Sequence, residues 1–277
     1  MFEGRRLLVA TKHKKEEVIA PLFFDEFGIT SFVLDHFDTD SFGTFTGEIS
    51  REGSPFDALK KKANAAMSKA NADLVVASEG TFGPHPTLFF VPADDELLLF
   101  RDTQNDLEIL AREVTTKTNF GSANVETEEE LITFADKSFF PSHGLILSSP
   151  LEPSKYFKGI VTKEELLHIF YQIKSNAKVV NVQTDMRALF NPTRMETIAK
   201  ACHKLVQNIK STCPRCFAPG YNVTDVLAGL PCSLCRRSTQ STLAHQYVCR
   251  KCGHDELRYY PNLKLEEEPT FCDYCNP

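Results

Sequence analysis

Four Cys-x-x-Cys pairs occupy the last quarter of the chain, and their residue type and spacing predict metal binding. Two thiolates at this spacing can face one cation from a tight turn, so eight thiolates supply two complete tetrahedral Cys₄ zinc sites. The spacing allows sequential pairing, first with second and third with fourth, and interleaved pairing, first with third and second with fourth. Of the two, we favour the sequential arrangement. The eight predicted zinc ligands are Cys213, Cys216, Cys232, Cys235, Cys249, Cys252, Cys272 and Cys275.

A second group of candidate residues lies near the N-terminus, where a basic turn follows a predicted buried strand. The apolar run from Arg6 to Thr11 predicts the strand, and Glu16 to Phe24 carries helical periodicity. Free backbone N–H groups at a helix N-terminus attract anions, so Thr11, Lys12 and Lys15 predict a phosphate-binding site. The alternative is a charged run that only faces solvent.

Carboxylates and arginines at later strand and helix ends could complete such a site. Glu79 follows the predicted strand Ala72 to Ser78, and Asp57 opens a helix rich in Ala and Lys. Both carboxylates could hold a divalent cation or activate water. Arg187 and Arg194 stand between a strand and the last long helix, where two guanidinium groups could clamp phosphates. Each arginine could instead form an ion pair or cap a helix.

The composition is that of an ordinary globular protein. The 277 residues are 42% apolar and 25% charged, with a formal net charge of −6, which argues against a fibrous or disordered chain. No stretch approaches the roughly 18 apolar residues needed to span a bilayer, and the first residues do not resemble a signal sequence. We therefore expect no membrane partner. Thiols reserved for zinc fit a reducing compartment, so we expect a cytoplasmic location.

Charge also limits the partners expected for the cysteine-rich segment. From Lys210 to Pro277 the sequence holds eight Lys or Arg and seven Asp or Glu residues, and two tetrathiolate zinc sites would add about four negative charges. This balance disfavours nucleic-acid binding, which depends on neutralising phosphates. It favours a structural role or contact with a protein partner. The sequence leaves the oligomeric state open, a homodimer included.

Strand and helix patterns alternate through the first three quarters of the chain. They predict an α/β or α+β domain over residues 1–209, a mixed sheet with flanking helices, followed directly by a double zinc-ribbon module over residues 210–277. Cys202 falls on the apolar face of the last long helix, which predicts a core residue and not a nucleophile.

The element boundaries are predicted from periodicity, capping signals and turn residues. Two capping boxes predict helix starts at Thr127 and Thr162. We expect further strands over Ser31–Asp35, which precedes the Gly- and Thr-rich stretch Asp38–Gly53, and over Gly144–Ser148 and Val179–Gln183. Further helices are expected over Phe56–Asn71, Leu107–Thr116 and Arg194–Ile209. A loop from Glu79 to Pro86 is expected before a hairpin that pairs Thr87–Pro92 with Glu96–Arg101.

Several short segments resemble the inosine triphosphate pyrophosphatase-like family of house-cleaning nucleotide hydrolases. Ala10 to Val18 is similar to the opening strand, phosphate turn and first helix of that family, and Phe56 to Ala63 is similar to its acidic, Ala/Lys-rich helix. Ala77 to Gly80 falls where the family has an acidic strand end that serves metal and water. The loop with Arg187 and Arg194 is similar to its C-terminal basic loop.

This resemblance implies a fold and an activity. It implies hydrolysis of a nucleoside triphosphate to the monophosphate and pyrophosphate, with phosphates on Lys15, Arg187 and Arg194 and with Mg²⁺ held by Glu79 and Asp57. The whole chain also resembles a bacterial family of unknown activity that shares the tract from Thr184 to Met195 and the tail from Cys272 to Pro277.

Two other functions stay open at this point. The first domain could bind a nucleotide or another phosphorylated small molecule without turnover, as a sensor, while the zinc module contacts a protein. Alternatively, the whole protein could be a nucleic-acid factor, which the acidic balance of the zinc module disfavours.

Overall fold

The computed structural model describes residues 1–35 and 54–277, without the side chain of Pro153. The described chain forms two compact units, Met1–Val206 and Gln207–Pro277. The stretch Asp38–Gly53, singled out in the sequence, lies outside the described residues. In the part of the chain that is described, no helix combines the length and apolar character needed to cross a membrane.

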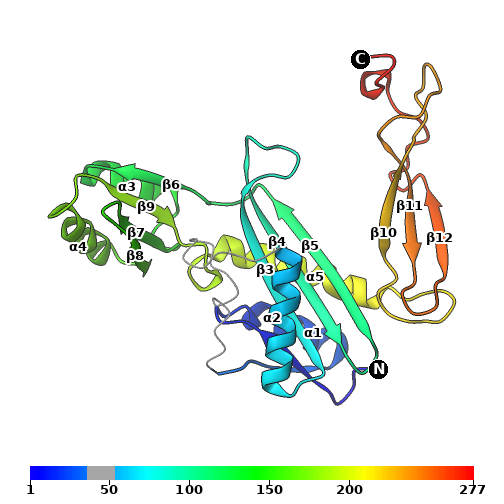
Figure 1. Ribbon diagram of the computed structural model, residues 1–277, viewed down its shortest axis with the longest axis horizontal. Helices are drawn as coiled ribbons and strands as arrows, with labels where there is room; N and C mark the ends of the chain where they lie inside the picture. Colours follow the sequence, from blue (N-terminus) through cyan, green and yellow to red (C-terminus); the bar gives the residue numbers. More distant parts are fainter. Residues whose placement is uncertain (36–53) are drawn as a thin grey trace. The chain divides into compact units, whose positions relative to one another are not determined.

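The first unit contains a five-stranded mixed sheet in the order β2-β1-β3-β4-β5 (Figure 1). Strands β1, β2 and β3 are parallel, whereas β4 and β5 add to β3 as antiparallel strands. Helix α1 connects β1 to β2, and helix α2 precedes β3. The elements are β1 (Arg6–Ala10), α1 (Glu16–Phe27), β2 (Thr30–Phe32), α2 (Pro55–Ala70), β3 (Leu74–Pro84), β4 (Pro92–Asp102) and β5 (Leu107–Thr115).

The two helices cover opposite faces of this sheet. Figure 1 shows α2 lying along β3 and β4, where its Leu59 packs in one buried cluster with Ala77 and Leu99. On α1, Phe23 stacks on Phe100 with 5.9 Å between ring centroids. Successive strand residues point to opposite faces, so Leu99 and Phe100 face α2 and α1 respectively. Both faces are thus buried, which explains the nearly continuous apolar runs of β1 and β3.

A second, four-stranded sheet in the same unit has the order β6-β9-β7-β8. Helices α3 and α4 pack on it through a separate core that includes Leu131, Leu147 and Phe170. Both predicted helix starts are confirmed: the Thr127 and Thr162 side chains accept hydrogen bonds from backbone N–H groups three residues later. The elements are β6 (Ser122–Val125), α3 (Glu128–Lys137), β7 (Leu145–Ser149), β8 (Glu152–Ile160), α4 (Lys163–Lys174) and β9 (Val180–Thr184).

Helix α5 (Pro192–Lys210) follows a short 3₁₀ turn, Ala188–Phe190. Asn191 caps the N-terminus of this helix, because its side chain accepts a 3.0 Å hydrogen bond from the backbone N–H of Arg194. Cys202 is fully buried on this helix, and burial raises the pKa of its thiol to about 12. This agrees with its predicted place in the core.

The second unit is built around a three-stranded antiparallel sheet in the order β10-β11-β12. Its apolar core is small: Cys213, Ala218, Tyr221 and Cys249 form one buried cluster. The strands are β10 (Val223–Ala228), β11 (Thr242–Val248) and β12 (Asp255–Tyr259), and a 3₁₀ turn at Pro269–Phe271 precedes the last cysteine pair.

Two predictions in the middle of the chain are wrong. The segment predicted as the helix Leu107–Thr116 is strand β5, with Leu107, Ile109 and Ala111 buried in a period of two. The loop predicted from Glu79 to Pro86 belongs largely to strand β3. Of the hairpin predicted beyond it, Thr87–Val91 lies in the turn after β3, and Glu96–Arg101 belongs to β4, which pairs with β3 along its whole length. Pairing with neighbouring strands outweighs the helix-forming side chains and the turn-like Asp94-Asp95 sequence. Strands β6 and β8 were not predicted.

Candidate functional site

The candidate site lies where β1 ends and β3 continues. Ala10 pairs with Ala77 in the last described register position between these parallel strands, so from Ser78 onward β3 has no β1 residue beside it. The chain leaves β1 toward β2 on one side and returns to β3 on the other, which makes the carboxyl ends of β1 and β3 a topological switch point. Open α/β sheets bind ligands at such points, because the two connections leave a crevice there.

Lys15 reaches into this region from the turn after β1. Its Nζ donates a 2.8 Å hydrogen bond to Ser78 Oγ, and the residue is 7% exposed. Burial, together with the nearby positive charges of Arg194 and Lys62, lowers the pKa of Lys15 to about 7, against the opposing effects of Glu96 and Glu79. The predicted phosphate-binding lysine is therefore a buried amine whose charge responds to pH near neutrality.

Lys62 of α2 approaches the same strand end. Its Nζ donates a 2.9 Å hydrogen bond to the carbonyl oxygen of Ser78 and forms an ion pair with Glu79. Glu79 therefore lies in β3 against a buried lysine, and not in a flexible loop as the sequence suggested. Lys62 is a site residue that the sequence reasoning missed. Its position on the face of α2 that carries Leu59, Ala63 and Ala66 was the available signal.

Arg194 joins the cluster from the first turn of α5. Its Nε donates a 2.6 Å hydrogen bond to Glu96 Oε1, and its guanidinium also donates to the carbonyl oxygen of Met186. Both side chains of the ion pair are buried, at 7% and 0% exposed. Burial alone would lower the pKa of Arg194, but the ion pair with Glu96 raises it above its usual value. Arg194 therefore stays charged.

Asp94 is the second carboxylate that β4 contributes, two residues from Glu96. It is fully buried, and among the described residues neither of its oxygens has a partner with hydrogen-bond geometry. Burial and the neighbouring Glu96 raise the pKa of Asp94 to about 7, against the opposing effects of Arg194, Thr197 and Lys15. Asp94 and Glu96 were missed because they were assigned to a turn and to the hairpin after it. Strand alternation, which puts them on one face, was the missed signal.

The other predicted residues lie in different surroundings. Thr11 is buried at the end of β1, where its Oγ1 accepts a 3.3 Å hydrogen bond from the backbone N–H of His13, and Lys12 is exposed. Asp57 is exposed at the start of α2, and hydrogen bonds from Ser54 lower the pKa of its carboxyl group. Asp57 therefore has a structural role as part of a helix cap, and its role as a metal ligand stays a prediction.

Arg187 and Arg194 bind different carboxylates. Arg187 forms a two-nitrogen contact with Asp185, with Nη2 2.6 Å and Nε 3.2 Å from Oδ2, and its guanidinium lies 4.5 Å from the centroid of the Phe190 ring. The two guanidinium groups therefore have different partners, and their joint role as a phosphate clamp stays a prediction.

The eight predicted zinc ligands form two groups of four. Within each group the sulfur atoms lie within 4.8 Å of one another. The groups join the first cysteine pair with the third and the second with the fourth, so the favoured sequential pairing is wrong and the interleaved pairing is correct. Antiparallel pairing of β10 with β11 and β11 with β12 brings distant segments together, which the cysteine spacing could not reveal. The groups are Cys213, Cys216, Cys249 and Cys252, and Cys232, Cys235, Cys272 and Cys275.

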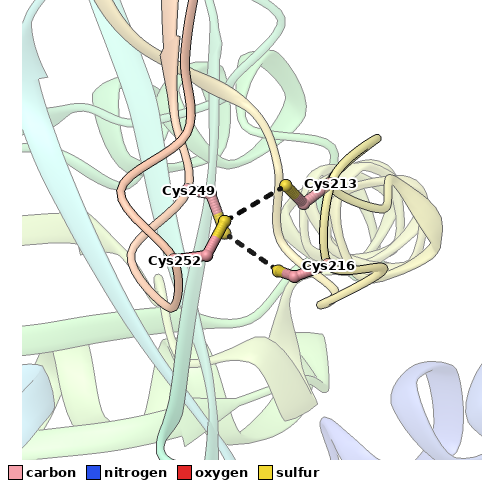
Figure 2. Close-up of side chains that lie close together, drawn as sticks. All are labelled: Cys213, Cys216, Cys249 and Cys252. Carbon is pink, nitrogen blue, oxygen red and sulfur yellow. Dashed lines mark hydrogen bonds between the residues drawn. The ribbon is translucent and has the colours of Figure 1, made fainter.

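The geometry of both groups fits a zinc ion. Figure 2 shows the Cys213 and Cys216 knuckle facing the Cys249 and Cys252 knuckle, with Sγ–Sγ distances of 3.7 Å and 3.6 Å between them. The second group has corresponding distances of 3.9 Å and 3.7 Å. A tetrahedron with Zn–S bonds of about 2.3 Å has S–S edges of about 3.8 Å. The sulfur atoms are therefore spaced for tetrahedral coordination.

The knuckle backbones support thiolate ligands. The residues directly after three knuckles, Phe217, Arg236 and Gly253, have φ between 60° and 67°, the left-handed conformation that glycine adopts most readily. Two knuckles thus adopt this turn without glycine. Backbone N–H groups of Cys235 and Leu234 lower the pKa of the Cys232 thiol to about 7, which favours its deprotonated, metal-binding form.

The comparisons with known proteins identify a family without giving an activity. Residues 62–277 match a family described as a domain of unknown function, DUF6671. The match begins within α2 and includes Glu79, Asp94, Glu96, Arg194 and all eight clustered cysteines. No curated protein sequence matches the chain. Because the match spans well over half of the sequence, the chain belongs to the DUF6671 family.

Proposed function

We propose that the first unit is a metal-dependent hydrolase that converts a nucleoside triphosphate to the monophosphate and pyrophosphate. One observation carries the proposal: three basic and three acidic side chains gather around the carboxyl end of β1 and the part of β3 that continues beyond it, the edge of the sheet where ligands bind in open α/β folds. The basic residues are Lys15, Lys62 and Arg194, and the acidic residues are Glu79, Asp94 and Glu96. An inosine triphosphate pyrophosphatase-like arrangement of this site is part of the proposal.

The basic residues suit a polyphosphate. Lysine amines and a guanidinium group are the side chains that bind phosphate oxygens, and their interactions are strong where water is excluded. Lys15 and Arg194 are at most 7% exposed, so a phosphate that replaced their present partners would be held by charges fixed in place. Fixed charges stabilise a phosphoryl-transfer transition state without reorganising during the reaction.

Glu79 is the residue that we assign to the attacking water. It would orient the water and accept its proton while the water oxygen bonds to the α-phosphorus and the bond to the bridging oxygen of pyrophosphate breaks. A bound Mg²⁺ ion would offset the charge of the polyphosphate and polarise the phosphoryl group. Lys62, which pairs with Glu79, orients the carboxylate.

The test is a direct assay of the zinc-loaded full-length protein. The protein is incubated with Mg²⁺ and a panel of nucleoside triphosphates with standard and modified bases, and both pyrophosphate and monophosphate are quantified. We expect release of the two products in equal amounts on at least one base and a loss of at least 100-fold in Glu79→Gln. Lys117→Met is the surface control, because the exposed Lys117 side chain forms an ion pair with the exposed Glu196.

The absence of turnover of every nucleoside triphosphate in the panel would reject the hydrolase. A sensor would still bind nucleotide under those conditions, and its affinity would fall in Lys15→Met while Glu79→Gln bound normally. Lys15→Met removes a buried charge without creating a cavity, so a loss of binding in this variant would not reflect misfolding.

A second candidate function concerns the zinc module and single-stranded nucleic acid. The interleaved pairing places Arg215, Arg250 and Lys251 in the two knuckles of one zinc group, beside Phe217, which is 74% exposed. The three basic residues are exposed as well. Basic side chains beside an exposed aromatic ring are the usual means of holding single strands. The other zinc group also has three basic residues nearby, but its segment adds more acidic ones, such as Glu266 and Asp273, and the charge total over the whole module did not reveal this difference.

The alternative is that these basic residues only offset the negative charge of a tetrathiolate zinc site. Fluorescence anisotropy with a labelled single-stranded oligonucleotide at increasing salt concentration distinguishes nucleic-acid binding from this alternative. Binding that weakens with salt and is lost in Arg215→Ala/Arg250→Ala/Lys251→Ala would support the function. The matched control removes Arg236, Arg237 and Lys264 near the other zinc group. Equal binding by both triple variants, or no binding at low salt, would reject it.

A further inference from the structure

The two carboxylates of β4 are the most unusual polar groups of the first unit. Asp94 and Glu96 are both 0% exposed, and three of their four oxygens, both of Asp94 and Oε2 of Glu96, have no hydrogen-bond partner among the described residues. A buried carboxylate without partners costs several kcal/mol. Beyond the effects of Thr197 and Arg194 on Asp94, the burial of these oxygens favours a proton or a cation bound between them.

The two side chains lie on the same face of the sheet. They occupy alternate positions of one strand and so point to the same face, about 7 Å apart along β4. On that face, Gly80 of β3 pairs with Glu96. A Cβ atom at position 80 would lie 2.4 Å from Glu96 Oε1 and 2.4 Å from Arg194 Nη2. Only glycine thus lets Arg194 and Glu96 approach the strand, and this contact holds Glu96 in place beside Asp94.

The remaining oxygens are hard, anionic ligands. Mg²⁺ and Mn²⁺ prefer carboxylate oxygens at about 2.1 Å, and Mg²⁺ is commonly held by one or two carboxylates while water and substrate phosphates complete its coordination. We propose that Asp94 and Glu96 form a divalent-cation site on β4 that binds Mg²⁺ or Mn²⁺ together with a phosphorylated ligand. The site rests on the proposed function for the source of the phosphate oxygens, but its affinity for metal alone can be measured independently.

Surrounding charges decide which groups the cation would contact. Arg194 occupies Glu96 Oε1, so Glu96 Oε2 and the two oxygens of Asp94 are the ligands that the chain offers. Lys15 and Lys62 add positive charge nearby. This repulsion predicts weak binding of the metal alone and tighter binding when phosphate is added, because the anion offsets the charge of the lysines.

The experiment measures Mn²⁺ binding to the zinc-loaded full-length protein by electron paramagnetic resonance of the free ion, with and without pyrophosphate. We expect one saturable Mn²⁺ site per chain and a loss of affinity of at least tenfold in Asp94→Asn. Asp94→Asn keeps the shape of the side chain and the Arg194–Glu96 ion pair. The matched control is Glu129→Gln/Glu164→Gln, which removes two carboxylates from exposed positions on α3 and α4.

The competing explanation is a proton shared by the two carboxylates. In that case Mn²⁺ would bind equally to the original chain and to Asp94→Asn, or to neither, and the cation site would be overturned. The hydrolase can fail separately. If Mn²⁺ binding depends on Asp94 but the protein shows no turnover, the cation site is supported and the hydrolase is rejected. If the protein turns over a nucleotide but Asp94→Asn binds Mn²⁺ as tightly as the original chain, the hydrolase is supported and the cation site is rejected. If Asp94→Asn does not fold, Asp94→Ser provides a second test, because it also removes the carboxylate and leaves the Arg194–Glu96 ion pair in place.

Discussion

Arg194 and Glu96 are 98 residues apart in the sequence, yet Arg194 Nε lies 2.6 Å from Glu96 Oε1 in the interior of the first unit. This ion pair links the first turn of α5 to strand β4. The two carboxylate oxygens of Glu96 therefore differ. Oε1 pairs with Arg194, whereas Oε2 has no hydrogen-bond partner among the described residues.

Breaking this pair from one side should be costly. We expect Arg194→Met or Glu96→Gln alone to lower the free energy of unfolding by about 3–5 kcal/mol, because each leaves a buried group without its partner. The double variant should lose less than the sum of the two. The same changes at the exposed pair Lys117 and Glu196 should cost at most about 1 kcal/mol. Urea unfolding followed by circular dichroism measures all of these, and additive effects at Arg194 and Glu96 would contradict the coupling.

Gly80→Ala should destabilise the same region. The added methyl group would lie 2.4 Å from both members of the ion pair, so they would have to separate, at a cost of about 1–3 kcal/mol. Gly83→Ala is the matched control on the same strand, because a Cβ atom there meets nothing within 4 Å. Thermal unfolding of the two variants checks this prediction. Equal midpoints would mean that the space around Gly80 is not restrictive.

Stability should rise with pH through the titration of Lys15. Burial lowers the pKa of Lys15 in the folded protein from 10.5 to about 7, so between these values the unfolded chain binds the extra proton. The cost of burying the charge is present in full below pH 7 and is relieved as the pH rises toward 10.5, by up to roughly 5 kcal/mol. The difference in unfolding free energy between Lys15→Met and the original chain should therefore shrink over this window. A difference in unfolding free energy that does not change with pH would contradict the lowered pKa of Lys15.

Zinc stoichiometry should distinguish the two pairings of the cysteines. In the interleaved arrangement Cys216 and Cys249 belong to one group, so Cys216→Ser/Cys249→Ser should retain about one zinc per chain, held by the intact second group. Sequential pairing would place one substitution in each site and weaken both. Cys216→Ser/Cys235→Ser is the complementary variant and should lose both ions. Elemental analysis after gel filtration gives the metal content.

Removing zinc should unfold the second unit more than the first. The second unit has a small apolar core that includes two cysteines of one zinc group, and metal binding stabilises such modules directly. A chelator should therefore increase hydrogen exchange in β10, β11 and β12, while β3 and β4, which pair along their whole length, stay protected. Uniform exchange across both units would contradict this prediction.

Local signals were sufficient wherever short-range chemistry decides the structure. The capping boxes at Thr127 and Thr162, the first strand and the last long helix were predicted because hydrogen bonds and periodicity within a few residues specify them. They failed at Leu107–Thr115, where strand pairing with β4 outweighs the helical preference of the side chains. Local signals also failed at Asp94, because the turn-like residues beside it in the sequence gave no indication that it lies inside a strand.

The sequence by itself determined that eight thiolates are spaced to hold metal, because Cys-x-x-Cys geometry is local and four such pairs leave no ligand over. It also predicted roles for Lys15, Glu79 and Arg194. Only the tertiary structure decided which cysteine pairs share a site, and only it brought Lys62, Asp94 and Glu96 to the end of β1. These contacts join segments up to 98 residues apart, and they depend on the order in which strands pair, which no local pattern encodes.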